Sequence, residues 1–425
     1  MCIFIVNQKI KLRSYYLYLA FINCRMQRIF HLKGKVQHYA WGGNSFIPNL
    51  LGLESSKQPC AEYWLGAHVN APSSVETTVG PIALDKFLED RPMQFLGSDI
   101  SNKYRRLPYL LKVLDVREML SIQVHPSKTE AEKGFKRENE LEIPLTAPNR
   151  NYKDDNHKPE IMVALNDFWL LHGFLPKASL IKRLEACPEL TSLITIFNQG
   201  SYKNLYEYVM HLPAAESNAI LKPLISRIMP LFKQGKIDKS SPDYWAAKAA
   251  SKGLESGNYD KGIYSIYFFN ILNVNQGEGV FQDAGIPHAY LEGQTMELMA
   301  NSDNVLRGGL TPKHIDIPEL LKHVIFEETH PEILKGEPTN DGMERVYKSI
   351  APDFELSHIV LKGNAVLSSN SKTAEVFILM EGNARVTENQ EVLELKKGDS
   401  FIAIADAEFK ISTESGTNIY KATTP

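Results

Sequence analysis

Cysteine is scarce in this chain and long apolar runs are missing, and these two absences exclude several classes of protein. The 4 cysteines among 425 residues are scattered, so neither a disulfide framework nor a cysteine-based zinc site is expected. No apolar run is long enough to span a bilayer as a helix. The formal net charge of -3 provides no basic surface for nucleic acid. We therefore expect a cytoplasmic protein with reduced thiols, and neither a membrane nor a nucleic acid as partner.

The N-terminal segment, residues 1–28, does not match a targeting signal. Lys9, Lys11 and Arg13 separate two short apolar runs, whereas a signal peptide carries its positive charge before a single apolar run. Met26, followed by Gln-Arg-Ile-Phe, is a more natural start. Residues 1–25 are therefore either an artefact of the gene start or a genuine extension.

The rest of the chain divides into stretches of β-like and helical pattern. The composition is that of a globular protein, with 43% hydrophobic and 23% charged residues, and its length predicts two or three domains. Short apolar runs between turn residues predict a mainly β region at 29–175, which resumes at 262–325. Residues 326–425 combine short strands with Gly-Asp turns, which predicts a small antiparallel barrel.

Helical spacing dominates between these β regions. At 176–261 apolar residues recur every three to four positions, as at Leu221, Leu224 and Ile228, so an inserted helical domain is predicted. A further short helix is expected within the first β region, from Thr129 to Asn139. An exposed loop follows it.

The stretch Ser121 to Pro126 places three polar side chains on one side of a predicted strand. Side chains alternate along extended backbone, so Ser121, Gln123 and His125 share one face and the apolar residues between them share the other. An amide and an imidazole two residues apart can both bind one cation. This segment therefore predicts part of a metal site.

Two other strands are predicted to begin at a metal-binding side chain, namely at Glu160 and at His288. Gln123, His125, Glu160 and His288 together offer nitrogen and oxygen ligands that suit Zn²⁺ with an open position, although Mn²⁺ or Fe²⁺ would also accept them. Other interpretations stay open for each residue taken alone. A histidine beside proline is commonly a turn residue, Glu160 could pair with Lys158 at the surface, and Gln123 could be an ordinary hydrogen-bonding residue.

A second cluster carries positive charge. Arg307 precedes two glycines, a setting that suits an anion held by a guanidinium and exposed backbone N–H groups; Lys313 and Lys112 could add to it. Lys112 interrupts an apolar run, where a charged group needs a partner or must reach the surface. Arg307 could equally form a structural ion pair with Asp303.

Seven motifs follow one another in a fixed order: Val36 to Gly42, Ala61 to His68, Leu107 to Val113, Ser121 to Pro126, His157 to Glu160, Pro287 to Tyr290, and Ser302 to Lys313. In sequence and order they resemble the type I mannose-6-phosphate isomerases, also called phosphomannose isomerases, of the cupin superfamily. The resemblance runs from about residue 36 to residue 316 apart from the helical block, and is weaker through the C-terminal barrel. It implies a catalytic cupin jelly roll holding one zinc per subunit, formed by 29–175 and 262–325, with an inserted helical domain and a second cupin-like barrel.

The resemblance also implies roles for individual residues. The zinc ligands of the family fall on Gln123, His125, Glu160 and His288, and its catalytic arginine falls on Arg307. Residues that line the active site and a proposed phosphate contact fall on Trp41, Glu62, Lys112, Ser121, Lys158, Tyr290, Glu297, Asp303 and Lys313. Two departures are small: Tyr63 stands where an aliphatic residue is usual, and Gly308 where alanine is common.

The implied reaction interconverts D-mannose 6-phosphate and D-fructose 6-phosphate through an enediol. A proton must leave C2 and return at C1, which requires a base, an acid and stabilisation of charge on oxygen. Lys158 and Glu297 are candidates for this transfer, and the sequence does not decide between them. His157 and Asp303 are candidates for opening the sugar ring. The expected partner is a small sugar phosphate, and the expected state is a monomer or weak dimer.

Other functions are weighed against this one. A cupin that binds sugar phosphates without catalysis need not keep the proton-transfer groups. An iron-dependent oxygenase favours two histidines and one carboxylate, so the glutamine ligand fits poorly. A bifunctional enzyme that also makes nucleotide sugars would need a glycine-rich nucleotide loop, which the chain does not have at its start.

Overall fold

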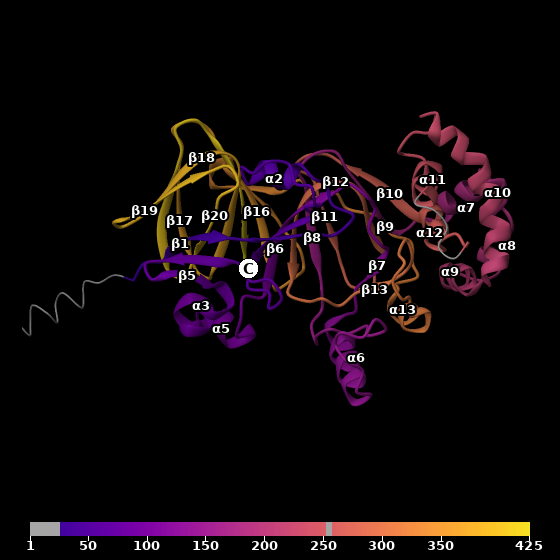
Figure 1. Ribbon diagram of the computed structural model, residues 1–425, viewed down its shortest axis with the longest axis horizontal. Helices are drawn as coiled ribbons and strands as arrows, with labels where there is room; N and C mark the ends of the chain where they lie inside the picture. The colour runs from indigo at the N-terminus through magenta and orange to yellow at the C-terminus, as the bar shows by residue number, and fades with distance from the viewer. Residues whose placement is uncertain (1–25, 252–256) are drawn as a thin grey trace, which may run out of the picture.

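The computed structural model describes residues 26–251 and 257–425. The predictions for residues 1–25 lie outside these ranges. Figure 1 shows a group of helices at one end, a β region in the middle and a second β region at the other end, coloured orange to yellow. The described chain is mainly β, as predicted, and all strand pairs within its two sheets are antiparallel.

The 10-stranded sheet, here called the first sheet, is organised around its longest strand, β12, which pairs with β6, β7, β8 and β9. Its order is β10-β9-β12-β6-β3-β2, with β7, β8, β11 and β13 joined at the side. The strands are β2 (Lys35–Gln37), β3 (Glu62–Gly66), β6 (Tyr109–Val116), β7 (Gln123–Val124), β8 (Glu160–Ala164), β9 (Phe168–Phe174), β10 (Phe269–Val274), β11 (Gly279–Gln282), β12 (His288–Ala300) and β13 (Leu306–Arg307).

The 12-stranded sheet, here called the second sheet, contains most of the C-terminal region and two early segments. Its strands are β1 (Ile29–Lys33), β4 (Ser74–Thr77), β5 (Gly80–Ala83), β14 (Glu337–Thr339), β15 (Glu344–Tyr347), β16 (Glu355–Leu361), β17 (Val366–Ser371), β18 (Glu375–Glu388), β19 (Glu391–Lys396), β20 (Ser400–Ala403), β21 (Ala407–Ser412) and β22 (Thr417–Thr423).

Strand β1 makes a pairing that the sequence did not predict. It pairs with β20, Ile29 opposite Ala403, and Ile29 is fully buried in the core of the C-terminal region. Residues 29–33, with β4 and β5, therefore pair in the second sheet, unlike the other strands of the predicted catalytic β region. Sequence alternation identifies a strand but not its distant pairing partner, which explains the difference. The division into domains otherwise stays a prediction.

The inserted region is helical, as predicted, and a further helix begins at Gly262, just beyond the expected end of the region at residue 261. Its elements are α7 (Lys177–Glu185), η1 (Pro188–Leu190), α8 (Ser192–Gln199), α9 (Tyr202–His211), α10 (Ala214–Lys233), α11 (Pro242–Ser251) and α12 (Gly262–Phe268). Proline stands at Pro176 and Pro213, just before α7 and α10, and at the first residue of α11, where its missing N–H costs nothing.

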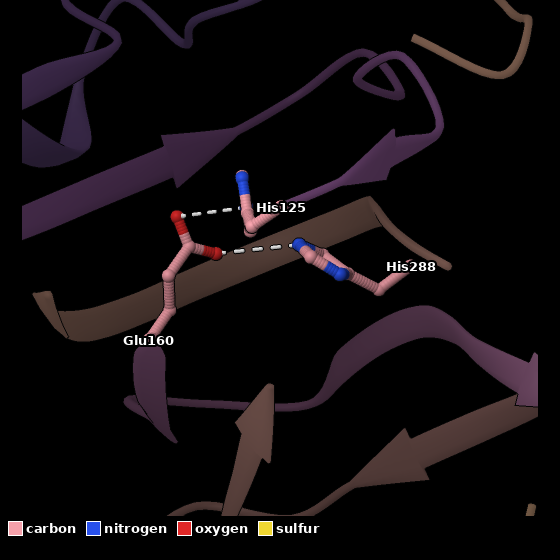
Figure 2. Close-up of side chains that lie close together, drawn as sticks. All are labelled: His125, Glu160 and His288. Atoms are coloured by element: carbon pink, nitrogen blue, oxygen red, sulfur yellow. Dashed lines mark ion pairs between the residues drawn. The ribbon is translucent and has the colours of Figure 1, made fainter. Parts of the chain in front are cut away.

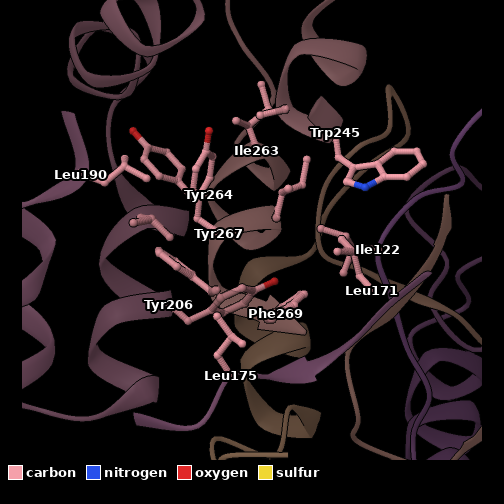
Figure 3. Close-up of a cluster of buried hydrophobic side chains, with 14 of the residues drawn as sticks. Ile122, Leu171, Leu175, Leu190, Tyr206, Trp245, Ile263, Tyr264, Tyr267 and Phe269 are labelled. Atoms are coloured by element: carbon pink, nitrogen blue, oxygen red, sulfur yellow. The ribbon is translucent and has the colours of Figure 1, made fainter. Parts of the chain in front are cut away.

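These helices pack directly on the first sheet. Figure 3 shows Trp245 of α11 near Leu171 of β9 and Ile122, which precedes β7, and Ile263 of α12 belongs to the same cluster. All four side chains are at most 1% exposed. Because one face of β9 packs on these helices, its other face is free to line the interior of the first sheet.

The remaining helices are short, apart from α6. They are α2 (Phe46–Leu50), α3 (Leu84–Asp90), α4 (Pro92–Phe95), α5 (Ser98–Tyr104), α6 (Lys128–Glu140), α13 (Ile317–His323) and η2 (Asn340–Gly342). Helix α6 confirms the helix predicted from Thr129 to Asn139, and the Ser127 hydroxyl caps it by accepting from the N–H of Glu130. No helix within 26–251 and 257–425 is long and apolar enough to cross a bilayer.

Candidate metal centre and active site

Three metal-binding side chains meet inside the first sheet. Figure 2 shows the Glu160 carboxylate facing the imidazoles of His125 and His288. Nε2 of His125 lies 3.5 Å from Oε1 of Glu160, and Nε2 of His288 lies 3.3 Å from Oε2. All three side chains are buried, and their ligand atoms lie within 4.8 Å of one another.

Hydrogen bonds on the far side of each ring fix which nitrogen carries the proton. Nδ1 of His125 donates to the carbonyl of Asn304, and Nδ1 of His288 donates to the carbonyl of Ile286, both at 2.9 Å. Because a carbonyl can only accept, Nε2 of a neutral ring keeps its lone pair. Burial lowers the pKa of His125 to about 4, so this ring is neutral near pH 7.

The two lone pairs have no partner. Nε2 of His125 and Nε2 of His288 are buried without a hydrogen bond, and both face the negative carboxylate of Glu160. Such electron-rich atoms repel one another unless a cation lies among them. A carbonyl acceptor on the far ring nitrogen is also typical of metal-binding histidines. The three residues therefore fit a divalent metal ion.

Strand register brings the fourth predicted ligand to the same place. Gln123 of β7 lies opposite His288 of β12 on one side and opposite Arg307 of β13 on the other. Opposed residues of antiparallel strands project from the same face, so the amide, the imidazole and the guanidinium share one face of the sheet. The predicted strand at residues 121–126 is shorter in the structure, because β7 contains only Gln123 and Val124.

A buried lysine and two carboxylates lie beside the triad. Nζ of Lys112 is 3.0 Å from Oε2 of Glu297 and 3.6 Å from Oε2 of Glu62. Burial disfavours its charge, but Glu297 and Glu62 outweigh burial and hold the pKa of Lys112 above its usual value. Of the two interpretations considered for Lys112, the structure therefore shows a buried charge with partners and not a charge that reaches the surface.

Glu297 differs from an ordinary surface carboxylate. Burial raises its pKa, and the negative charges of Glu160 and Glu62 act in the same direction against the attraction of Lys112. Glu297 lies opposite Lys112 in the β12–β6 register, so the contact is built into the sheet. A raised pKa brings a carboxyl group closer to the range in which it can both give and accept a proton.

A cavity of about 50 Å³ lies among these groups. Its walls are formed by Glu62, Lys112, Leu114, Leu120, Gln123, Lys158, Glu160, His288, Tyr290 and Glu297. Nζ of Lys158 is 3.2 Å from Oε1 of Glu160, and this pair is buried rather than solvated. A larger hollow of about 560 Å³ lies along α9, beside the end of α8 and the start of α10, but it contains none of the predicted site residues.

Arg307 and Lys313 form the positive edge of the site. Burial lowers the pKa of Arg307, and burial together with Arg307 lowers the pKa of Lys313. No ion pair joins Arg307 to Asp303 in the described part of the chain. Asp303 instead lies beside His68, with 3.4 Å between its Oδ1 and Nε2, so the structural ion pair that we considered for Arg307 is absent there.

The other predicted residues lie at different places around the cavity. Trp41 packs against the cluster that contains Tyr290, and Ser121 is half-buried before β7. His157 points elsewhere: its Nε2 lies 2.8 Å from Oδ2 of Asp353 in the C-terminal region. His157 is not among the residues that line the cavity. No ion pair joins it to Asp303, the other residue considered for ring opening, in the described part of the chain.

Two residues that contact predicted site residues were missed in the sequence. Tyr39 stacks on Trp41 with 5.9 Å between ring centroids, and Glu62 and Asp303 help burial to raise the pKa of its phenol. The second is His68, beside Asp303. Tyr39 lies within the motif Val36 to Gly42 and His68 within the motif Ala61 to His68. The motifs could therefore have identified both residues, whereas residue type alone could not.

Comparisons with known proteins agree with this site. Residues 29–177 match the family model described as phosphomannose isomerase type I, catalytic domain. Mannose-6-phosphate isomerase of Escherichia coli is 35% identical over 88% of this chain and 94% of its own length, and mannose-6-phosphate isomerase 2 of Arabidopsis thaliana is 32% identical over 93% of each chain.

Solved structures give the same result. A zinc-bound mannose 6-phosphate isomerase superposes with a TM-score of 0.81 at 31% identity, covering 94% of this chain and 100% of the other. A mutant phosphomannose isomerase from Salmonella typhimurium gives a TM-score of 0.83 with the same coverage and identity. Together with the buried triad, these matches show that the chain belongs to the type I phosphomannose isomerases.

Proposed function

We propose that this chain is a zinc-dependent isomerase that interconverts D-mannose 6-phosphate and D-fructose 6-phosphate through an enediol. The observation that carries the proposal is the buried His125, Glu160 and His288 triad, whose imidazole lone pairs lack partners, beside the proton-carrying groups of the cavity. The identity of the substrate is inferred from the relatives, which are named mannose-6-phosphate isomerases. A site that only bound a sugar phosphate would not need buried acid–base groups around a metal.

Gln123, His125, Glu160 and His288 would hold the zinc. Two neutral imidazoles, a carboxylate and an amide oxygen are within the range of zinc ligands, although the amide is unusual. When bound, zinc polarises a carbonyl and stabilises negative charge on the substrate oxygens. The remaining chemistry belongs to the side chains of the chain itself.

Lys158 and Glu297 are the two candidates to move the proton between C2 and C1. Both line the cavity, and each lies against a residue of opposite charge that fixes its position: Lys158 against Glu160, and Glu297 against Lys112. The raised pKa of Glu297 suits a group that alternates between acid and base. The choice between the two residues stays a prediction.

Arg307 and Lys313 are proposed to bind the phosphate group. Their charges have no carboxylate partner among the ion pairs of the described residues, and a guanidinium presents paired N–H donors that match phosphate oxygens. Lys112 suits this role less well than its motif implied, because Glu297 and Glu62 already balance its charge. We propose that Lys112 holds Glu297 in place instead.

The predicted architecture supports the same proposal. The first sheet would be the catalytic cupin jelly roll, α7 to α12 the inserted domain and the second sheet the second cupin-like barrel. A cytoplasmic location and a monomer or weak dimer stay predictions, and light scattering of the purified chain tests the oligomeric state.

The direct test is a coupled assay for fructose 6-phosphate formed from mannose 6-phosphate, with metal content measured on the same sample. We expect about one zinc per chain, loss of activity on chelation and recovery when zinc is returned. An active protein that remains free of metal after chelation would contradict the zinc proposal. A protein replete with zinc but without isomerase activity would favour the sugar-phosphate sensor considered above.

A further inference from the structure

A carboxylate and an imidazole from distant parts of the chain form a pair near the site, outside the residues that line its cavity. Oδ1 of Asp303 lies 3.4 Å from Nε2 of His68, and Oδ2 accepts a hydrogen bond of 3.2 Å from the side-chain amide of Asn70. The backbone N–H of Asp303 donates to Oδ2 of Asp154 at 2.8 Å, which fixes the main chain. The Asp303 side chain is 40% exposed, whereas that of His68 is 6% exposed.

A hydrogen bond from the backbone sets the tautomer of His68. The backbone N–H of Asn70 donates to Nδ1 of His68 at 3.3 Å, so Nδ1 is the acceptor and Nε2 of the neutral ring carries the proton towards Asp303. Trp64 holds the ring in an edge contact, with 4.9 Å between centroids. Trp64 is anchored in turn by its indole N–H, which donates to Glu62. The imidazole is therefore held from two sides with its N–H aimed at the carboxylate.

The charge of Asp303 interacts with Lys158 and Lys112, which line the cavity. Burial raises its pKa, but His68, Lys158 and Lys112 outweigh burial and lower it below the usual value. Its negative charge also helps to raise the pKa of Tyr39 and opposes the lowering of the pKa of Lys153. An ionised carboxylate in this place can accept a proton from a substrate hydroxyl without first losing its own.

We propose that His68 positions Asp303, one of the two residues considered above for opening the sugar ring, and that Asp303 carries this proton without His157. The proposal rests on the proposed isomerase function. The O1 hydroxyl proton of the pyranose passes to the Asp303 carboxylate as the C1=O1 double bond forms. The C1–O5 bond breaks with its electron pair on O5, and the same proton passes from Asp303 to O5. The open-chain aldehyde results, and no other reactant is needed.

The geometry distinguishes the two histidines. His68 contacts Asp303 directly, while Nε2 of His157 is engaged by Asp353. Moreover, one carboxylate with two oxygens can serve both O1 and O5 in turn. A second acid on His157 is therefore not required for the proton balance.

Ring opening can be measured apart from isomerisation. Exchange NMR of mannose 6-phosphate reports the rate at which the enzyme interconverts the α and β anomers. The deuterium isotope effect on isomerisation of 2-deuterated mannose 6-phosphate reports whether C–H cleavage limits the rate. The comparison uses zinc-loaded wild type, His68→Gln, His157→Gln and Asn70→Ala, with zinc content and thermal unfolding measured for each.

For His68→Gln we expect anomer exchange to fall about 10-fold or more and the isotope effect to shrink towards 1, because ring opening becomes the slower step. Asn70→Ala removes an exposed donor to Asp303, so it keeps the fold and lowers anomer exchange by a smaller factor. His330→Gln is the matched control, since His330 also lies 3.4 Å from a carboxylate, Glu328, but at the surface. It should change neither rate.

Unchanged anomer exchange and an unchanged isotope effect in His68→Gln would overturn the proposal, as would loss of anomer exchange in His157→Gln alone. If His68→Gln does not fold, unchanged exchange in Asn70→Ala overturns it instead. Failure of the proposed function gives a different result, namely wild type that makes no fructose 6-phosphate at all.

Discussion

The two sheets enclose opposite kinds of side chain. The interior of the first sheet contains His125, Glu160, Lys112 and Glu297, all at most 6% exposed. The interior of the second sheet contains Phe377, Phe401 and Phe409, also at most 2% exposed, with centroids 4.3 to 6.0 Å apart. The same class of strand thus surrounds a polar site in one region and an apolar core in the other.

This difference has an energetic meaning. Each aromatic pair of the second sheet contributes about 0.5–1.5 kcal/mol beyond the burial of its area. Buried charges in the first sheet each lose hydration worth several kcal/mol, which partners only partly restore. The second sheet is therefore built for stability, while the first retains groups that stability alone would not select. We infer that those groups are retained for chemistry.

Removing a ligand from the first sheet should have the largest effect on function. We expect His288→Ala to lose zinc and to lower kcat/KM by about 10⁴-fold or more, because the charge stabilisation that a bound metal supplies is worth several kcal/mol. Metal analysis and the coupled assay measure both losses. The control His330→Ala removes an exposed imidazole. A variant that keeps its zinc and its activity would refute the ligand assignment.

Removing a ring from the second sheet should have the reverse outcome. Phe401→Ala is expected to lower the free energy of unfolding by about 3–5 kcal/mol, because it leaves a cavity among fully buried rings. Zinc bound per folded chain should not change. Denaturant unfolding gives the first quantity, and metal content measured below the transition gives the second. Loss of zinc from fully folded protein would show that packing in the second sheet affects metal binding in the first.

The arginines of the two regions provide a smaller contrast. We expect Arg307→Gln to lower kcat/KM by about 10- to 100-fold with zinc retained, since one charged contact to substrate is worth about 1.5–3 kcal/mol. Arg385→Gln in the second sheet breaks only the exposed pair with Glu394, and it should leave the kinetics unchanged. Steady-state assays with metal analysis distinguish these outcomes. Normal kinetics in Arg307→Gln would return that residue to a structural role.

The sequence predicted the mainly β character, the helical insertion and the strand starts at Glu160 and His288, because alternation and helical spacing are local properties. Contacts between distant strands were not predictable in this way. The pairing of Lys112 with Glu297 and of His68 with Asp303 depends on the register of β3, β6 and β12 and on the loops that follow them. For the same reason His157, which shares a motif with Lys158, could not be seen to face Asp353.

The smallest expected effect concerns a half-buried imidazole of the second sheet. His358 of β16 stacks on Tyr420, and its Nε2 lies 2.6 Å from the side-chain oxygen of Asn418. In the first sheet, by contrast, the same atom of His125 and His288 has no partner. Burial lowers the pKa of His358, and Arg345 adds to this, while Asn418 and Glu381 oppose it.

A lowered pKa means that the unfolded chain binds the proton more tightly, so this residue favours folding above its unfolded pKa of about 6.5 and weakens it as the pH falls below that value. In His358→Gln the side chain cannot titrate, and the difference in unfolding free energy from wild type should therefore shrink steadily as the pH is lowered below about 6.5. Urea unfolding at a series of pH values measures this difference, in which the other titrating groups cancel. A difference that does not depend on pH would show that His358, like an ordinary core residue, contributes only packing.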